Sequence, residues 1–117
     1  MATFAPPKGT RDFYPELMAV QHHLFDSWER TCRRYGFERY DGPMFEHLDI
    51  YRQKSGDEIE TQLYTFQDKA GRELSLRPEM TPTLARMVAA AGSNLKWPIR
   101  WYSIPRLFRY EKMQRGR

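Results

Sequence analysis

Residues 98–117 read PIRWYSIPRLFRYEKMQRGR, and the interpretation of the whole sequence depends on this stretch. Its first part, residues 99–104, alternates with the period of two that is typical of a β-strand and is rich in β-branched and aromatic residues. Arg109 and Glu111 follow two positions apart, so a continuing strand would place both side chains on one face. An arginine fork beside a carboxylate suits a ligand that carries both a phosphate and a hydrogen-bond donor. We therefore expect a strand that leads into a ligand-binding loop.

The composition indicates one globular domain. The chain has 117 residues, of which 40% are hydrophobic and 15% aromatic, which is enough for a modest core and excludes a disordered chain. The net charge is +4, and residues 98–117 hold six cations against the single anion Glu111. This charge favours an anionic partner such as a nucleotide or RNA. An ordinary solvated basic surface explains it equally well.

No targeting, membrane or metal motif is apparent in the sequence. The N-terminus lacks the charged and apolar regions of a signal peptide, and no window approaches the roughly 18 apolar residues of a membrane span. The single cysteine, Cys32, fits a reducing compartment. His22 and His23 are adjacent on a predicted helix and so point apart, which argues against a metal pair. We expect a soluble cytoplasmic protein without a metal site of its own.

Hydrophobic periodicity and turn residues predict an arm followed by alternating helices and strands. The predicted elements are a helix over 15–35 closed by Gly36, a strand from Phe37 interrupted at Gly42–Pro43, a short helical or irregular piece over 50–54, a polar loop over 55–60, a hairpin of 63–66 with 74–76, a helix from Thr81 to Ala91, and the strand that begins at Ile99. This order indicates an α+β domain in which helices flank an antiparallel sheet.

The junction between the hairpin and the second helix gathers the polar side chains of Arg77, Glu79 and Thr81. Thr81 is predicted to be the N-cap, with Pro82 as the first helical residue. Such junctions host ligands because free backbone N–H groups and side chains converge there. From the residues alone, an ordinary cap with a surface salt bridge is the better explanation. Neither common glycine-rich nucleotide loop is present.

Four stretches occur in a fixed order along the chain. They are KGTRDFYP at residues 8–15, the predicted helix and strand that reach Pro43, YTF at 64–66 with LRPEMT at 76–81, and FRYEKMQRGR at 108–117. Together they resemble the first part of a class II aminoacyl-tRNA synthetase catalytic domain, most closely that of the histidyl-tRNA synthetase family. The second stretch resembles motif 1, and the last resembles the start of motif 2. The resemblance covers nearly the whole chain, and its stretches are far more specific together than any one alone.

The resemblance implies roles in histidine activation. The positions that match Glu79 and Thr81 hold the α-ammonium group of histidine, for which a carboxylate and a hydroxyl are suitable partners. The position that matches Arg109 contacts the α-phosphate of ATP and the carboxylate of the amino acid. An arginine there stabilises the charge that develops as the carboxylate attacks phosphorus.

The resemblance also implies roles around ATP, tRNA and the subunit interface. The position matching Glu111 lies near the adenine or its magnesium-linked surroundings, and the position matching Arg117 reaches the ATP phosphates. Gln114 and Arg115 match the motif 2 loop, which also meets the acceptor end of tRNA. Pro43 matches motif 1, which forms the class II dimer interface.

As a whole, the resemblance implies a ligase that activates histidine with ATP and Mg²⁺ to histidyl-adenylate and transfers it to tRNA(His), acting as a homodimer. The second arm of motif 2, motif 3 and the anticodon-binding domain have no match in residues 1–117. We therefore expect this chain to be an N-terminal fragment of the catalytic domain that is not competent alone.

Two other functions compete with the ligase. The regulatory subunit of ATP phosphoribosyltransferase resembles the same catalytic domain but does not charge tRNA. Its counterpart of LRPE commonly carries aspartate, so Glu79 favours the synthetase, as does the intact FRYEKMQRGR at 108–117. A pure interaction module that only dimerises through motif 1 is the third interpretation, and a monomer at high concentration would weaken it.

Overall fold

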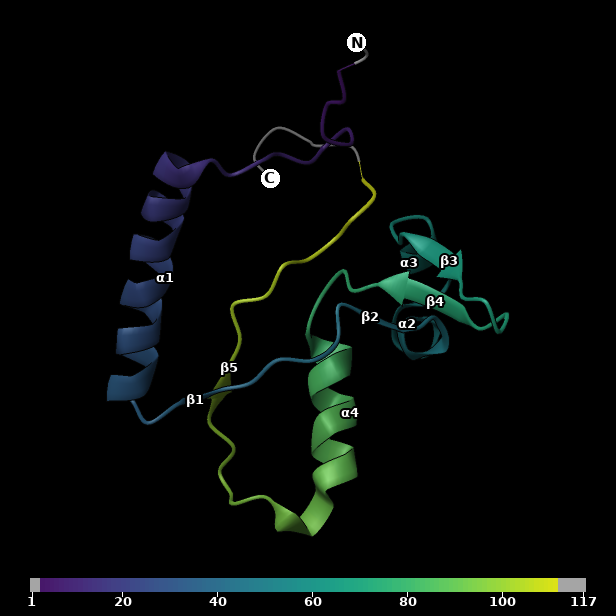
Figure 1. Ribbon diagram of the computed structural model, residues 1–117. Helices are drawn as coiled ribbons and strands as arrows, with labels where there is room; N and C mark the ends of the chain where they lie inside the picture. Colours follow the sequence, from purple (N-terminus) through teal and green to yellow (C-terminus); the bar gives the residue numbers. More distant parts are fainter. Residues whose placement is uncertain (1–2, 112–117) are drawn as a thin grey trace. The chain divides into compact units, whose positions relative to one another are not determined.

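The computed structural model describes residues 3–111 (Figure 1). The chain divides into two compact units, Met1–Glu38 and Arg39–Arg117. The first unit contains one helix. The second unit contains the other helices and a three-stranded antiparallel sheet. The predicted α+β class with an antiparallel sheet is confirmed.

Helix α1 (Pro15–Arg34) forms most of the first unit, as predicted from the sequence. Pro15 occupies the first turn, where its missing N–H costs no hydrogen bond, and Glu16 lies near the positive end of the helix dipole. The helix ends at Arg34, and Gly36 follows with a φ of 77°, a left-handed conformation that glycine adopts without strain. None of the residues of α1 is buried.

The three-stranded sheet of the second unit has the order β2–β4–β3. Its strands are β2 (Phe45–His47), β3 (Thr65–Gln67) and β4 (Glu73–Leu76), and both neighbouring pairs are antiparallel. Strands β3 and β4 form the predicted hairpin. Phe45 and Phe66, from the outer strands, meet edge to face with ring centroids 5.7 Å apart.

The hairpin loop is organised by Asp68. Its Oδ1 atom accepts hydrogen bonds from the amides of Ala70 at 3.0 Å and Arg72 at 2.9 Å, and its Oδ2 atom pairs with Arg72 Nε at 2.6 Å. The amide and guanidinium of Arg72 hold the pKa of the Asp68 carboxyl below its ordinary value. Gly71, at a φ of 79°, supplies the left-handed residue that closes the turn.

A small apolar core lies beneath the sheet and consists of Leu48, Tyr51 and Leu63, with Ile50 and Ile59 packed against it. Helix α2 (Asp49–Ser55) supplies Tyr51, so the helical alternative for residues 50–54 is confirmed. Helix α3 (Asp57–Glu60) lies where we predicted a polar loop, and that prediction was wrong. The reason is tertiary, because Ile59 packs against the core cluster.

Arg52 of α2 forms ion pairs with its own helix, with α3 and with β4. Its guanidinium pairs with Glu60 of α3, with Glu73 of β4 at 3.1 Å and with Asp49 of its own helix at 3.2 Å. All four side chains are substantially exposed, so each pair contributes little by itself. The network links α2 with α3 and with β4.

Tyr51 is 1% exposed, and its hydroxyl has no hydrogen-bond partner among the described residues. Burial, and then the negative charge of Glu46, raises the pKa of Tyr51 to about 12. Because an unpaired buried hydroxyl is costly, Tyr51→Phe should raise the free energy of unfolding by about 1 kcal/mol. Chemical denaturation of the two proteins measures this difference. A clear loss of stability would show that the hydroxyl has a partner in the folded protein.

Helix α4 (Thr81–Ala91) follows the sheet and passes at Gly92 into the 3₁₀ turn η1 (Gly92–Asn94). The prediction that Thr81 is the N-cap was wrong by one residue. The N-cap is Met80, no side chain caps the helix, and Thr81 is its first residue. Pro82 still lies in the first turn, where proline is tolerated.

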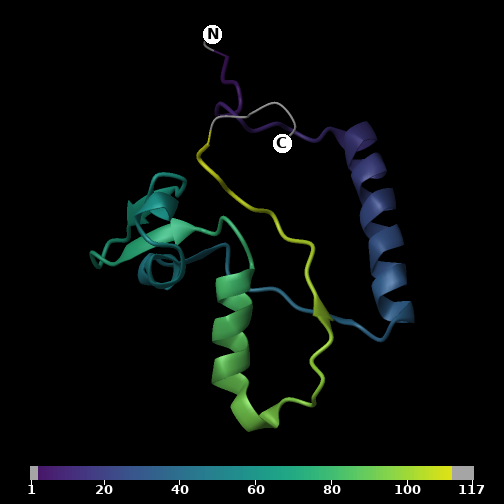
Figure 2. The ribbon, with the colours of Figure 1, turned by 180° about the vertical axis from the view of Figure 1, so that it is seen from behind.

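The C-terminal strand is much shorter than the alternating stretch of sequence, residues 99–104, from which it was predicted. Strand β5 (Trp101–Tyr102) forms a two-stranded sheet with β1 (Glu38–Arg39), and the Tyr40 amide donates to the Tyr102 carbonyl at 3.0 Å. Residues 103–111 belong to no strand, so the prediction of a strand through Glu111 was wrong. Figure 2 shows this segment, in yellow, running from β5 towards the hairpin.

Candidate functional site

The candidate site is built around Arg77, which follows β4 and is 2% exposed. Its Nη1 atom donates to Asp41 Oδ1 at 2.6 Å and to the Gly42 carbonyl at 3.1 Å, and its Nε atom donates to the Arg106 carbonyl at 3.0 Å. Its own carbonyl accepts from the Phe108 amide at 2.9 Å. One buried residue therefore connects the chain before β2 with the chain after β5.

The ion pair between Arg77 and Asp41 is asymmetric, because the Asp41 side chain is 61% exposed. Partial burial of the Asp41 carboxyl tends to raise its pKa, but hydrogen bonds from Arg77 and the Gly42 amide outweigh it and leave the pKa below its usual value. Asp41 therefore stays ionised at neutral pH and balances the buried guanidinium.

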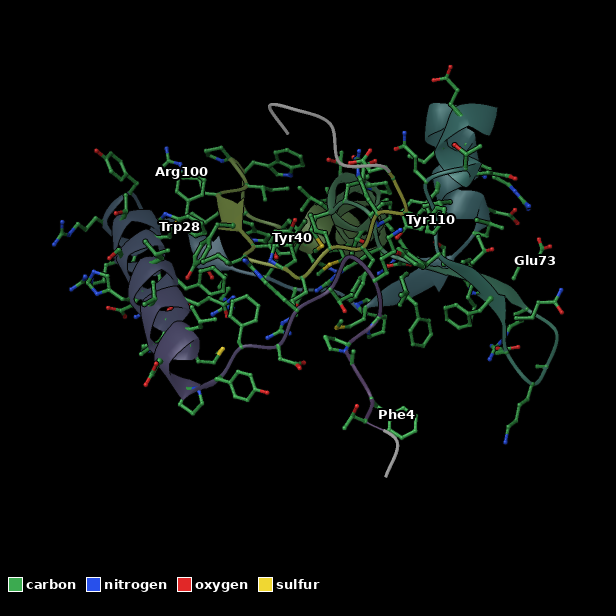
Figure 3. All side chains as sticks on the ribbon, turned by 90° about the horizontal axis from the view of Figure 1, so that it is seen from above. Phe4, Trp28, Tyr40, Glu73, Arg100 and Tyr110 are labelled. Atoms are coloured by element: carbon green, nitrogen blue, oxygen red, sulfur yellow. The ribbon has the colours of Figure 1, made fainter. Side chains whose placement is uncertain are left out.

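The segment that carries Arg109 is extended and tied to the hairpin region at alternate residues. The Phe108 amide donates to Arg77, and the Tyr110 amide donates to the Gln62 carbonyl at 2.9 Å. The Tyr110 ring, labelled in Figure 3, meets Tyr64 edge to face with centroids 5.5 Å apart. Arg109 thus lies between two fixed amides, although this segment is not part of either sheet.

Arg109 lies close to the other half of the predicted site. Its Nε atom donates to the Pro78 carbonyl at 3.4 Å, and Pro78 directly precedes Glu79. Glu79 is half-buried, while Thr81 is exposed at the start of α4. The fold therefore joins LRPEMT and FRYE, two stretches about 30 residues apart that the sequence analysis had combined only through a resemblance.

The remaining predicted site residues are placed unequally. Glu111 is exposed at the end of the described segment, and Gln114, Arg115 and Arg117 lie outside the described residues. Pro43 lies between Gly42 and Met44, and Arg77 binds both of these neighbours. Its side chain donates a hydrogen bond to the Gly42 carbonyl, and its backbone amide donates one to the Met44 carbonyl at 3.0 Å. Pro43, the residue proposed for the subunit interface, is therefore adjacent in sequence to two residues that are hydrogen-bonded to Arg77.

The chain around Pro43 is also held by the first turns of α4. Glu46 is buried, accepts a hydrogen bond from the Thr83 hydroxyl at 3.2 Å and pairs with Arg86 at 2.7 Å. A side chain at Gly42 would collide with Cγ2 of the fully buried Thr83. Glycine is needed there because the backbone comes so close to α4.

A groove of about 630 Å³ lies against the three-stranded sheet and reaches Pro43, Glu46 and Arg86. Its walls include Phe45, Phe66 and Arg72, and it touches none of Glu79, Thr81 and Arg109. We assign the site to the Arg77 region because the polar side chains converge there. Within residues 3–111, no helix has the length and apolarity to cross a bilayer, and no three His, Cys, Asp or Glu side chains gather as a metal site.

Comparison with known proteins decides the family. The family model described as histidyl-tRNA synthetase matches residues 9–117. The chain belongs to the histidyl-tRNA synthetase family. Relatives named histidine–tRNA ligase include proteins from Opitutus terrae, with 53% identity over the whole chain, and from Leptospira biflexa, with 57% identity over 94% of it. The chain spans 27% and 25% of their respective lengths, about a quarter of each.

Solved structures show the same family fold. A histidine–tRNA ligase subunit from Alicyclobacillus acidocaldarius matches 93% of the chain with a TM-score of 0.79 and 29% identity, over 32% of its own length. A Bacillus halodurans structure described as an ATP phosphoribosyltransferase regulatory subunit/histidyl-tRNA synthetase matches 96% of the chain with a TM-score of 0.83 and 26% identity, over 29% of its own length. The predicted family and fold are confirmed.

Sequence reasoning about this histidyl-tRNA synthetase family member missed the structural role of Arg77. We had grouped it with Glu79 and Thr81 as one member of a possible surface salt bridge. No local pattern in the sequence signals this role. Burial reveals it, because Leu74 and Ser75 in β4 are buried and Arg77, just after the strand, is buried with them.

Proposed function

We propose that this chain is the N-terminal part, residues 1–117, of the catalytic domain of a histidine–tRNA ligase. The ligase forms histidyl-adenylate from histidine and ATP and then transfers histidine to tRNA(His). The observation that carries this proposal is the Arg109 hydrogen bond to Pro78, because it brings an arginine to the backbone beside Glu79. The names of the curated relatives support the choice of histidine as the amino acid.

Glu79 and Thr81 bind the α-ammonium group of histidine in this proposal. A carboxylate neutralises the ammonium charge, and a hydroxyl accepts one of its directed N–H bonds. Arg109 faces the reacting atoms. Its guanidinium holds the histidine carboxylate and the α-phosphate of ATP together, and it stabilises the negative charge that builds up as a carboxylate oxygen attacks phosphorus and pyrophosphate leaves.

The remainder of the nucleotide site lies at and beyond Glu111 in this proposal. Glu111 lies near the adenine or the magnesium, Arg117 binds the ATP phosphates, and Gln114 and Arg115 lie in the loop that meets the acceptor end of tRNA. One carboxylate together with substrate phosphates is a usual arrangement for Mg²⁺, so the chemistry of Glu111 fits this ion. A magnesium ion held there would neutralise charge on the ATP phosphates.

The ligase is proposed to be a cytoplasmic homodimer in which Pro43 lies at the interface formed by motif 1. The position of Pro43 supports a link between dimerisation and activity, because both of its neighbours accept hydrogen bonds from Arg77. Analytical ultracentrifugation of the complete protein tests the oligomeric state directly.

The second candidate function is that of the regulatory subunit of ATP phosphoribosyltransferase. The description of the similar Bacillus halodurans structure names this function beside the synthetase. Glu79 favours the ligase, because the regulatory subunits commonly carry aspartate at the matching position. The arginine-rich stretch at 108–117 also favours the ligase, since a regulator has no need to hold ATP for adenylation.

The complete protein that contains this chain should catalyse exchange of radiolabelled pyrophosphate into ATP only when histidine is present. Adenylation is reversible, so exchange reports its formation without tRNA. Other amino acids at the same concentration serve as controls. Absence of exchange, combined with stimulation of ATP phosphoribosyltransferase by the same protein, would establish the regulatory function instead.

A further inference from the structure

We propose that Arg77 is the positioning residue for Arg109, and that it sets the rate of adenylation without contacting histidine or ATP. This inference rests on the proposed function for its catalytic consequence. Its structural part stands on the hydrogen bonds of Arg77, which hold the backbone of residues 106–108 from two directions.

Arg77 forms hydrogen bonds to this backbone through both its side chain and its main chain. The Nε atom donates to the Arg106 carbonyl at 3.0 Å, and the Arg77 carbonyl accepts from the Phe108 amide at 2.9 Å. These bonds fix the two peptide groups that flank Leu107, two residues before Arg109. The Tyr110 amide is tied separately to Gln62, so Arg109 extends from a segment held on both sides.

The other end of the same guanidinium is anchored to the chain that precedes β2. Nη1 is bonded to Asp41 and to the Gly42 carbonyl, and Gly42 lies against the buried Thr83 of α4. Arg77 is also joined through one peptide bond to Pro78, whose carbonyl accepts from Arg109. The distance between Arg109 and the Glu79 segment is therefore set through one rigid fork.

The choice of a charged residue is informative. A buried cation loses its hydration, and apolar side chains of similar volume often replace buried ion pairs without loss of stability. Stability alone therefore does not require an arginine at position 77. A guanidinium does provide what an apolar residue cannot, namely several N–H donors at fixed angles, which reach acceptors from two separate segments at once.

The first test is kinetic and compares Arg77→Lys with the wild type in the complete protein. Lysine keeps the charge but lacks the fork, so it cannot hold Asp41, Gly42 and Arg106 together. We expect the rate of adenylate formation in single turnovers to fall by about 10- to 100-fold, as for a misplaced catalytic group. The KM for histidine should stay within about threefold, because Glu79 keeps its place.

A double-mutant cycle separates positioning from general destabilisation. If Arg77 acts through Arg109, Arg77→Lys should slow adenylation little or not at all in the Arg109→Ala background. The matched control is Arg52→Gln, which breaks the ion pairs of Arg52 with Asp49, Glu60 and Glu73 in the same unit, none of which involves Arg77 or residues 106–109. It should lower the midpoint of thermal unfolding and leave the adenylation rate unchanged. Additive effects of Arg77→Lys and Arg109→Ala would overturn the proposal.

The second test needs no activity. Amide hydrogen exchange should become at least about tenfold faster at Phe108 and Tyr110 in Arg77→Lys, while the amides of α4 keep their wild-type rates. Uniformly faster exchange would show that Arg77 serves only stability, and unchanged exchange at Phe108 would show that it positions nothing; either result contradicts the proposal. If exchange accelerates locally in Arg77→Lys but the wild-type protein does not catalyse pyrophosphate exchange, the proposed function is refuted while the structural part of this inference stands.

Discussion

Replacing Arg109 with alanine in the complete protein is expected to slow histidyl-adenylate formation by about 10²- to 10³-fold. The histidine carboxylate and the α-phosphate that Arg109 is proposed to hold are already negative in the free substrates, but further negative charge builds up on the α-phosphate oxygens in the transition state, and Arg109 stabilises that additional charge. Its loss should therefore appear in kcat, and the KM for histidine should change much less. Single-turnover measurement of adenylate formation, together with pyrophosphate exchange at varied histidine, gives both constants.

Two further variants sharpen this prediction. Arg109→Lys retains a positive charge without the planar fork, so its rate should lie between those of the wild type and Arg109→Ala. Arg106→Ala removes another exposed arginine of the same segment and keeps the carbonyl that Arg77 binds. It should behave like the wild type. Equal losses in Arg106→Ala and Arg109→Ala would mean that only the overall positive charge matters, and the assigned role of Arg109 would be wrong.

The elements that were predictable from the sequence are those with local causes. Helix α1 follows from its apolar period, from Pro15 at its start and from Gly36 after its end, all of which lie within the helix or next to it. The hairpin follows in the same way, since Asp68 binds amides only two and four residues away. Such interactions are encoded in a short stretch and need no knowledge of the rest of the fold.

The predictions that failed depend on distant contacts. Helix α3 has four residues, and it forms where Ile59 packs on a cluster assembled from α2 and the chain before β3. The segment after β5 has the alternation of a strand, yet its amides bond to Arg77 and Gln62 rather than to a neighbouring strand. Nothing in the local pattern distinguishes these partners, which lie 31 and 48 residues away in sequence.

The candidate site lies between these two cases. Its residue types and motifs could be identified from the sequence, including Glu79, Thr81 and Arg109. The role of Arg77, which joins them, could not be identified from the sequence, because nothing in the sequence distinguishes this arginine from one that is exposed on the surface. Only burial reveals its role, since a charged side chain that is 2% exposed must satisfy its donors inside the protein. Here those acceptors belong to the two segments that border the site.

The prediction for Glu79 differs in kind from the one for Arg109. Glu79→Ala in the complete protein should raise the KM for histidine by about 10²-fold, because the α-ammonium group would lose the carboxylate that neutralises its charge in the proposed site. The effect on kcat at saturating histidine should be smaller than that of Arg109→Ala, since the ammonium carries the same charge before and during the reaction. Pyrophosphate exchange over a wide range of histidine concentrations separates the two constants.

The control for this prediction is Glu73→Ala, which removes a carboxylate from the same unit that pairs with Arg52 and lies on the hairpin. It should leave the KM for histidine unchanged. Glu79→Gln keeps a hydrogen-bond acceptor without the charge, so its KM should lie between those of the wild type and Glu79→Ala. If Glu79→Ala and Arg109→Ala instead changed KM and kcat in the same modest proportion, the division of labour between the amino-acid side and the phosphate side of the site would be refuted. The two variants together therefore test the site more stringently than either does alone.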